Sequence, residues 1–167
     1  MRKMTEDNVK AALAGESQAH IKYLAFAYKA TVDKLPNVAR AFQAAAYSEQ
    51  IHATNHLKTL RGIGSTADNL SAARAGENFE VEEMYPAYAK VAEAQGEKIA
   101  LTFINYAFAA EKVHGEIYKR AQESVSKGQD IPASPIHVCG VCGFTMEGTA
   151  PDKCPVCGSP KDKFTTF

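Results

Sequence analysis

The sequence predicts an all-α four-helix bundle followed by a small metal-stabilised domain, and two observations predict this class. Residues 6 to about 127 are rich in Ala, Glu, Lys and Gln, with apolar residues recurring every three or four positions. The four cysteines fall between Cys139 and Cys157. A chain of 167 residues has room for one ordinary domain and a small appendage. We therefore expect a bundle at 1–130, a linker at 131–136 and a small domain at 137–167.

Turn and breaker residues divide the helical region into four helices. The predicted helices are Glu6 to about Thr31, Val38 to about Arg61, about Asn69 to Gln95, and Glu97 to about Lys127. Thr5 is a plausible N-cap for the first helix, and Pro36 separates it from the second. Gly62 ends the second helix, as glycine commonly does. Pro86 should kink the third, because its ring clashes with the carbonyl four residues earlier.

A Glu-x-x-His pair occurs twice, and each pair follows a lone glutamate by a similar interval. The two sets are Glu16 with Glu49–His52, and Glu80 with Glu111–His114. At this spacing a glutamate and a histidine share one face of a helix. Four facing helices with this pattern form the carboxylate site of di-iron and di-manganese bundles. One such pair arises readily by chance, whereas two in register indicate a metal site.

The glutamates of these sets, together with Glu83, fall on core-facing stripes that contain no Lys or Arg. A glutamate there has a high desolvation cost unless it is paired or binds metal. Four negative charges balance two divalent ions, and Glu83 would compensate when the ions become trivalent. Hard carboxylates with imidazoles suit iron or manganese and permit oxygen or peroxide chemistry. Glu77 and Glu82 fall off the third stripe and are expected to be solvated.

The four cysteines form two Cys-x-x-Cys-Gly knuckles separated by eleven residues. The knuckles are Cys139–Gly143 and Cys154–Gly158. Four thiolates at this spacing predict a tetrahedral site for zinc or a single iron. The segment is too short to build a large core and needs a metal to hold it together. Taken alone, this segment would favour a structural zinc ribbon. Because all four cysteines lie in this one segment, they argue against a disulfide framework across the chain.

With both metal sites in view, the chain resembles the rubrerythrins over nearly its full length. The matching stretches are Ala14–Ala19, Glu49–Ala53, Ala75–Glu77 through Glu80 to Met84–Pro86, Glu111–His114 and both cysteine knuckles. The resemblance implies a ferritin-like bundle and a C-terminal rubredoxin-like domain. The interval from Glu49 to Glu80 is shorter than in the longer family members.

The resemblance also implies ligand roles. Glu16, Glu49, Glu80 and Glu111 would bind iron, with Glu49 and Glu111 bridging and His114 on one ion. The other ion would move between Glu83 and His52 as the redox state changes. Tyr23, two turns after Glu16, would either hydrogen-bond a ligand carboxylate, which the resemblance favours, or fill the core. Neither His20 nor His56 matches a family ligand, and His137 is expected at the surface.

The resemblance implies a peroxidase of oxidative-stress defence that reduces hydrogen peroxide to water, and the absence of a targeting or membrane segment leads us to expect it in the cytoplasm. Its oxo-bridged di-iron centre would receive electrons from one iron held by the cysteines, which are Cys139, Cys142, Cys154 and Cys157. A rubredoxin or an NAD(P)H-dependent reductase would supply them. One rival is a ferroxidase or iron-handling protein, and another is a non-enzymatic module with zinc in the ribbon.

Composition and connection length bear on partners. Lys+Arg and Asp+Glu both number 19, which gives no indication of a nucleic-acid or membrane partner. The N-terminus is polar, and no apolar run approaches a membrane span.

A ferritin-like fold needs a connection that crosses the bundle, yet residues 62–70 reach only about 30 Å against helices of about 37 Å. We therefore expect a homodimer in which the two helical hairpins are exchanged between copies, with one subunit's FeS4 centre near the other's di-iron site.

Overall fold

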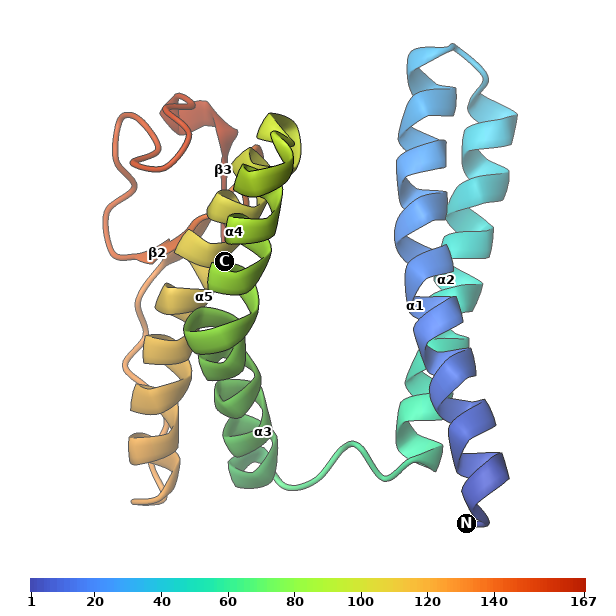
Figure 1. The fold of residues 1–167 in the computed structure, drawn as a ribbon, viewed down its shortest axis with the longest axis horizontal. Helices are drawn as coiled ribbons and strands as arrows, with labels where there is room; N and C mark the ends of the chain where they lie inside the picture. Colours follow the sequence, from blue (N-terminus) through green and yellow to red (C-terminus); the bar gives the residue numbers. More distant parts are fainter. The chain divides into compact units, whose positions relative to one another are not determined.

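The computed structural model describes residues 1–167, which form two compact units, Met1–Gly64 and Ser65–Phe167. Each unit is described by itself below (Figure 1). None of the helices combines the length and the apolar character that a membrane span requires.

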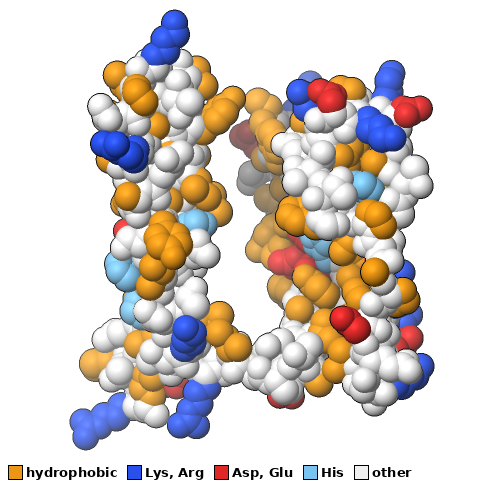
Figure 2. Space-filling model, turned by 180° about the vertical axis from the view of Figure 1, so that it is seen from behind, with side chains coloured by type: hydrophobic (Ala, Val, Ile, Leu, Met, Phe, Trp, Pro, Cys, Tyr) orange, Lys and Arg blue, Asp and Glu red, His pale blue; other side chains and the backbone are white.

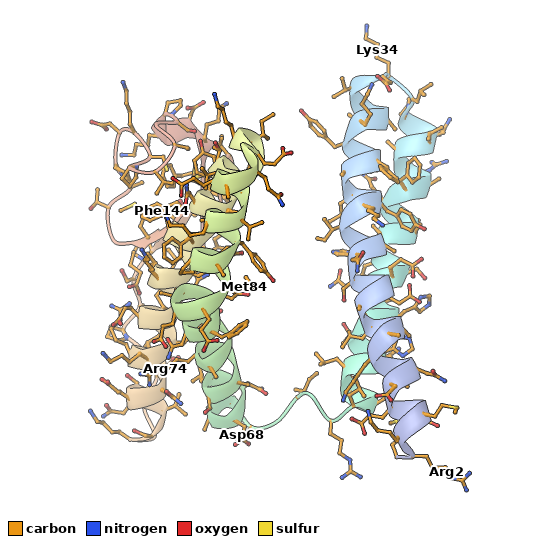
Figure 3. All side chains as sticks on the ribbon, viewed as in Figure 1. Arg2, Lys34, Asp68, Arg74, Met84 and Phe144 are labelled. Atoms are coloured by element: carbon orange, nitrogen blue, oxygen red, sulfur yellow. The ribbon has the colours of Figure 1, made fainter.

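The first unit is a helical hairpin of α1 (Lys3–Val32) and α2 (Pro36–Thr59) (Figure 1). Lys34 lies at its tip (Figure 3) and adopts the left-handed conformation, with φ at 60°. Pro36 occupies the first turn of α2, where its missing N–H costs nothing. The helix ends agree with prediction to within about three residues. The predicted N-cap is wrong: α1 begins two residues before Thr5, at Lys3.

Small residues hold the two helices of the hairpin close together. Its buried residues are Ala27, Ala30, Ala39 and Ala46. Beside them the rings of Tyr23, Phe26 and Phe42 form a cluster with centroid separations of 5.5–6.2 Å. Other apolar side chains remain exposed along the hairpin, as Figure 2 shows in orange. The hairpin therefore buries only part of its apolar surface within its own unit.

The second unit contains a long helical rod beside α5 (Lys98–Val125) (Figure 1). The rod comprises α3 (Thr66–Phe79), the π-helical turn η1 (Glu80–Met84) and α4 (Tyr85–Gln95). It begins with a capping box in which Ser65 and Asp68 each accept a backbone hydrogen bond from the other. This box starts α3 a few residues earlier than predicted. Arg74, labelled in Figure 3, donates to Gln122 of α5 at 3.0 Å.

The interruption predicted at Pro86 takes the form of the π-helical turn. The N–H of Tyr85 donates to the carbonyl of Glu80, five residues earlier. Met84 (Figure 3) is the last residue of this turn, two positions before Pro86. A π turn carries more residues than an α turn and so changes which side chains face the neighbouring helix. Gly96 then ends α4 in the left-handed conformation.

The C-terminal module of the second unit is a three-stranded antiparallel sheet of order β2-β1-β3. Its strands are β1 (Ile136–Cys139), β2 (Thr145–Glu147) and β3 (Phe164–Thr166), with a short 3-10 helix, η2 (Lys161–Lys163), before β3. Strand β2 lies against α5, where Arg120 forms an ion pair with Glu147. The sheet and α5 thus belong to one compact body.

Candidate metal centres

The four cysteines converge into one cluster, as the knuckle spacing predicts. The Sγ atoms of Cys139 and Cys157 are 3.7 Å apart, and those of Cys142 and Cys154 are 3.6 Å apart. A tetrahedral ion with metal–sulfur bonds of about 2.3 Å places its sulfurs about 3.8 Å apart, whereas a disulfide brings them to about 2.05 Å. All four thiols are free. The cluster has the dimensions of a metal site.

Both knuckles use the same backbone device to turn the cysteines inward. Gly143 donates to the carbonyl of Cys139 at 2.8 Å, and Gly158 donates to that of Cys154 at 2.9 Å. Both glycines have positive φ, which disfavours residues with a side chain. Burial opposes ionisation of Cys157, but hydrogen bonds from Ser159, Cys142 and Cys154 together outweigh it and lower the pKa of this thiol to about 6. One ligand is therefore readily available as thiolate.

The hairpin of α1 and α2 brings together the first predicted carboxylate–histidine set. Glu16, Glu49 and His52 place ligand atoms within 4.8 Å of one another. Nδ1 of His52 lies 3.0 Å from Oε2 of Glu49. A hydrogen bond between the two carboxyl groups raises the pKa of Glu16 and lowers that of Glu49. On the face seen in Figure 2, histidine side chains lie near the middle of the hairpin's length.

The second unit brings together a matching set from α3 and α5. Glu77, Glu111 and His114 also place ligand atoms within 4.8 Å of one another. Nδ1 of His114 lies 2.7 Å from Oε2 of Glu111 and 3.7 Å from Oε1 of Glu77. Burial, followed by a hydrogen bond with Glu111, raises the pKa of Glu77 to about 7. Its Oε2 is buried with no hydrogen-bond partner, as expected of an atom that awaits a ligand.

The expectation that Glu77 is solvated is therefore wrong, since its side chain is only 16% exposed. On a helix, the residues three and four positions after Ala73 both continue the same face. The sequence prediction took the step to Gly76 and therefore left Glu77 off the core-facing stripe. Glu80 lies one turn further on, half-buried, and interacts with Glu77. The structure does not bring Glu83 into this cluster, because Glu83 is exposed on the π turn. Glu82 is exposed as predicted.

Tyrosines lie close to both carboxylate sets. Tyr23 lines the same surface depression as Glu49, although its ring packs on Phe42 and no hydrogen bond to a carboxylate is present. In the second unit, burial, together with Glu77 and Glu111, raises the pKa of both Tyr85 and Tyr118. Both phenols therefore stay protonated and remain potential hydrogen-bond donors beside the acidic cluster.

Two of the remaining histidines, His20 and His137, have structural partners. His20 donates from Nδ1 to the carbonyl of Ala46 at 2.8 Å, which links α1 to α2. His137 is buried, contrary to expectation, because its ring bonds to Thr166 and to the carbonyl of Gly148. A contact that the sequence did not indicate is the 2.8 Å hydrogen bond between His114 Nε2 and Thr145 Oγ1. No spacing rule connects these two residues, which are 31 positions apart.

Comparison with known proteins gives matches over both the helical region and the cysteine module. Residues 7–122 match the family model Rubrerythrin, and residues 137–165 match the model for the rubrerythrin rubredoxin-like domain. Rubrerythrin-2 of Clostridium acetobutylicum is 40% identical over 98% of this chain and 97% of its own length. Nigerythrin of Nitratidesulfovibrio vulgaris is 34% identical over 98% of this chain and 86% of its own length. The solved structure of fully reduced, all-ferrous nigerythrin covers 98% of this chain and 86% of its own, with 33% identity and a TM-score of 0.56.

Proposed function

The chain belongs to the rubrerythrin family, and from that premise we propose that it is a non-haem di-iron peroxidase that reduces hydrogen peroxide to water. One observation carries the proposal. The cysteine cluster and the set of Glu77, Glu111 and His114 belong to one compact unit, in which Thr145 of the cysteine module hydrogen-bonds to His114. An electron-carrier module beside a carboxylate–histidine set is the arrangement that repeated reduction of an oxidant requires.

The residues present fit the metals that this activity needs. Each helical set supplies two carboxylates and one imidazole, which are ligands suited to iron, and the partnerless Oε2 of Glu77 provides an open donor atom. Two irons in the helical sets would supply electrons to peroxide, and an iron in the cysteine cluster would replace them one at a time. The chain's own task is to hold these donors in place and to keep Tyr85 and Tyr118 protonated beside them.

We assign the third carboxylate position to Glu77 in place of Glu80. Glu77 is the third-helix glutamate that lies with Glu111 and His114. Glu80 then becomes the carboxylate one turn away that exchanges with His52, the role first assigned to Glu83. This assignment keeps five carboxylates near the metals without requiring the exposed Glu83 to turn inward.

The cysteine cluster provides the test that separates a peroxidase from a ferroxidase or iron-handling protein, which has no need of a reductant inlet. In Cys142→Ser, reduced protein should still react once, rapidly, with peroxide, but turnover with a rubredoxin or an NAD(P)H-dependent reductase should be lost. Stopped-flow absorbance and a peroxide-consumption assay measure the two steps. Unimpaired turnover in the variant would overturn the proposal that electrons pass through the cysteine-bound iron. Faster oxidation of the reduced protein by oxygen than by peroxide would favour the ferroxidase.

The connection between the units supports a dimer with exchanged hairpins. Only residues 60–65 separate α2 from α3, so Thr59 and Thr66 can be at most about 25 Å apart. A ferritin-like bundle has a crossover at this point. In such a bundle α2 and α3 are parallel, and Glu49 and Glu77 must lie at the same height. At a rise of about 1.5 Å per residue, Glu49 lies about 15 Å before the end of α2 and Glu77 about 17 Å after the start of α3. The connection would therefore have to span about 31 Å along the bundle axis. The connection is too short, and we propose that the hairpin of one copy completes the bundle of another.

Exposed apolar surface on both units is consistent with this assembly. The hairpin exposes Ile21, Leu24 and Ile51, and the second unit exposes Phe79, Val91 and Phe103. A monomer rarely leaves so many large apolar side chains uncovered. Mutual burial of these surfaces by two copies would remove them from water.

Complementation tests the exchange directly. Glu49→Ala and Glu111→Ala chains are each expected to be inactive, because each disrupts one carboxylate set. In a swapped heterodimer, one bundle receives both substitutions and the other receives none, so co-refolding should recover one intact bundle in every heterodimer. Heterodimers without recovered iron or activity would show that each bundle comes from a single chain. Two preparations of the same variant, co-refolded, are the matched control.

A further inference from the structure

We propose that Thr145 is a positioning residue for His114, holding the imidazole in the tautomer that presents Nδ1 to a metal in the bundle. The inference rests on the proposed function only in taking His114 as a metal ligand. Thr145 belongs to the sheet of the cysteine module, so a residue of the electron-carrier module would orient a ligand of the helical site. Nothing in the spacing of the two motifs indicates this connection.

The geometry assigns separate partners to the two ring nitrogens of His114. Nε2 lies 2.8 Å from Oγ1 of Thr145, whereas Nδ1 faces Glu111 at 2.7 Å and Glu77 at 3.7 Å. Thr145 is only 4% exposed, which excludes water as an easy substitute for its hydroxyl. The ring is therefore held between the acidic cluster on one side and the sheet on the other.

In the structure Nδ1 hydrogen-bonds to Glu111, and once a metal takes Nδ1 the donor balance at Thr145 places the remaining ring hydrogen. The Thr145 hydroxyl has one hydrogen, which it donates to the carbonyl of Gly143 at 3.3 Å. Its oxygen is left to accept from His114, so the ring hydrogen belongs on Nε2. A neutral imidazole with its hydrogen on Nε2 carries its lone pair on Nδ1, the atom directed at Glu111 and Glu77. This is the tautomer that a metal between these carboxylates needs.

The position of Thr145 is set by the first cysteine knuckle. Thr145 pairs with Val138 across β1 and β2, and the neighbouring Phe144 (Figure 3) accepts a hydrogen bond from the N–H of Cys139 at 2.9 Å. Glu147, two residues on and therefore on the same face of the strand, forms its ion pair with Arg120 of α5. Strand β2 thus meets α5 through two side chains. Thr145 orients the imidazole of His114, and the more exposed ion pair holds the strand against the helix.

The test compares Thr145→Val, which keeps the shape and removes the hydroxyl, with Thr145→Ser, which restores it. Thr166→Val is the matched control, because Thr166 makes a similar 2.9 Å hydrogen bond to His137 in the same sheet. Full-chain protein loaded with zinc allows nitrogen-15 NMR of the histidine tautomers. Competition with a zinc chelator gives the affinity of the bundle site. Neither measurement depends on peroxide turnover, so failure of the proposed activity would leave this test unaffected.

The expected result is an Nε2–H tautomer for His114 in the unsubstituted protein. Thr145→Val should lose this uniform tautomer and weaken zinc binding in the bundle roughly 10- to 100-fold, the usual effect of removing such a supporting contact. Thr145→Ser and Thr166→Val should resemble the unsubstituted protein. An Nδ1–H tautomer in the unsubstituted protein would overturn the proposal even if the valine variant fails to fold. Unchanged affinity in a folded valine variant, or no rescue by serine, would also overturn it.

Discussion

At the scale of single residues, Glu77 shows how burial prepares a carboxyl group for a metal. Its pKa of about 7 lies above the ordinary value of 4.5, chiefly because burial penalises the charged form. At neutral pH the group is therefore only partly ionised. A metal ion bound beside Glu77 would compensate the negative charge of its carboxylate. When no metal is bound, ionisation of this carboxyl group opposes folding.

Chelator-treated protein should accordingly lose stability from this group as the pH rises from about 4.5 to 7. The raised folded-state pKa favours the protonated carboxyl, so its favourable contribution is complete below the unfolded pKa and is lost through the folded one. The loss should be at most about 3 kcal/mol. Urea unfolding at pH 5 and pH 7 measures it, with Glu77→Gln as reference. Parallel pH dependence in the two proteins would contradict the prediction.

Three of the rod's glutamates, Glu77, Glu80 and Glu83, should differ in their effect on iron content. Glu77→Gln should remove most of the iron bound with Glu111 and His114, because it deletes a ligand atom from the cluster. Glu80→Gln should retain iron but slow turnover, whereas Glu83→Gln should have little effect on either, since Glu83 is exposed. Iron analysis and steady-state peroxide assays distinguish them. Loss of activity in the Glu83 variant alone would restore the role first predicted for it.

At the scale of elements, the cysteine module depends on its metal more than the helices do. Its buried residues are His137, Cys139, Thr145 and Cys154, which provide almost no apolar core. Metal removal should therefore abolish amide-exchange protection in β1, β2 and β3 while α1 and α2 retain theirs. Hydrogen-exchange mass spectrometry before and after treatment with a strong chelator measures this. A sheet that stays protected without metal would contradict it.

The helices show which features a sequence can predict. The period of apolar residues located all four helical segments, and the ferritin-like class with a rubredoxin-like domain is confirmed. The period did not identify Glu77 as the glutamate of α3 that lies with Glu111 and His114, because Ala73 is followed by acceptable steps to both Gly76 and Glu77. The π turn is also invisible to a template of 3.6 residues per turn. Ser65 and Asp68 did carry a recognisable capping signal that would have placed the start of α3 correctly.

The candidate sites divide in the same way between local and distant signals. Both knuckles and both Glu-x-x-His pairs were found because their members lie within one turn or one loop of each other. The hydrogen bond from His114 to Thr145 joins α5 to β2 and depends on how the module docks. No local pattern encodes such docking. The sequence therefore predicted which acidic, histidine and cysteine residues cluster better than it predicted the residues that support them.

At the scale of the whole molecule, the connection from Thr59 to Thr66 should decide the assembly. Inserting about ten Gly and Ser residues after Gly62 would let one chain span the crossover of about 31 Å. The protein should then become a monomer with a complete iron complement, as measured by light scattering and metal analysis. The same insertion between Ala133 and Ser134 leaves this connection unchanged and should leave a dimer. A protein that is already monomeric and fully loaded without any insertion would contradict the exchange.

The division of ligands between the two units also has a kinetic consequence. Glu16, Glu49 and His52 lie on one unit, and Glu77, Glu111 and His114 lie on the other. On the proposed assembly, newly made chains must collide before either bundle is complete, so the rate of iron acquisition would rise with the square of chain concentration. Sparse chains would hold no complete iron pair and perform no peroxide chemistry. The short stretch of six residues would thus make the abundance of the protein a control on its own activation.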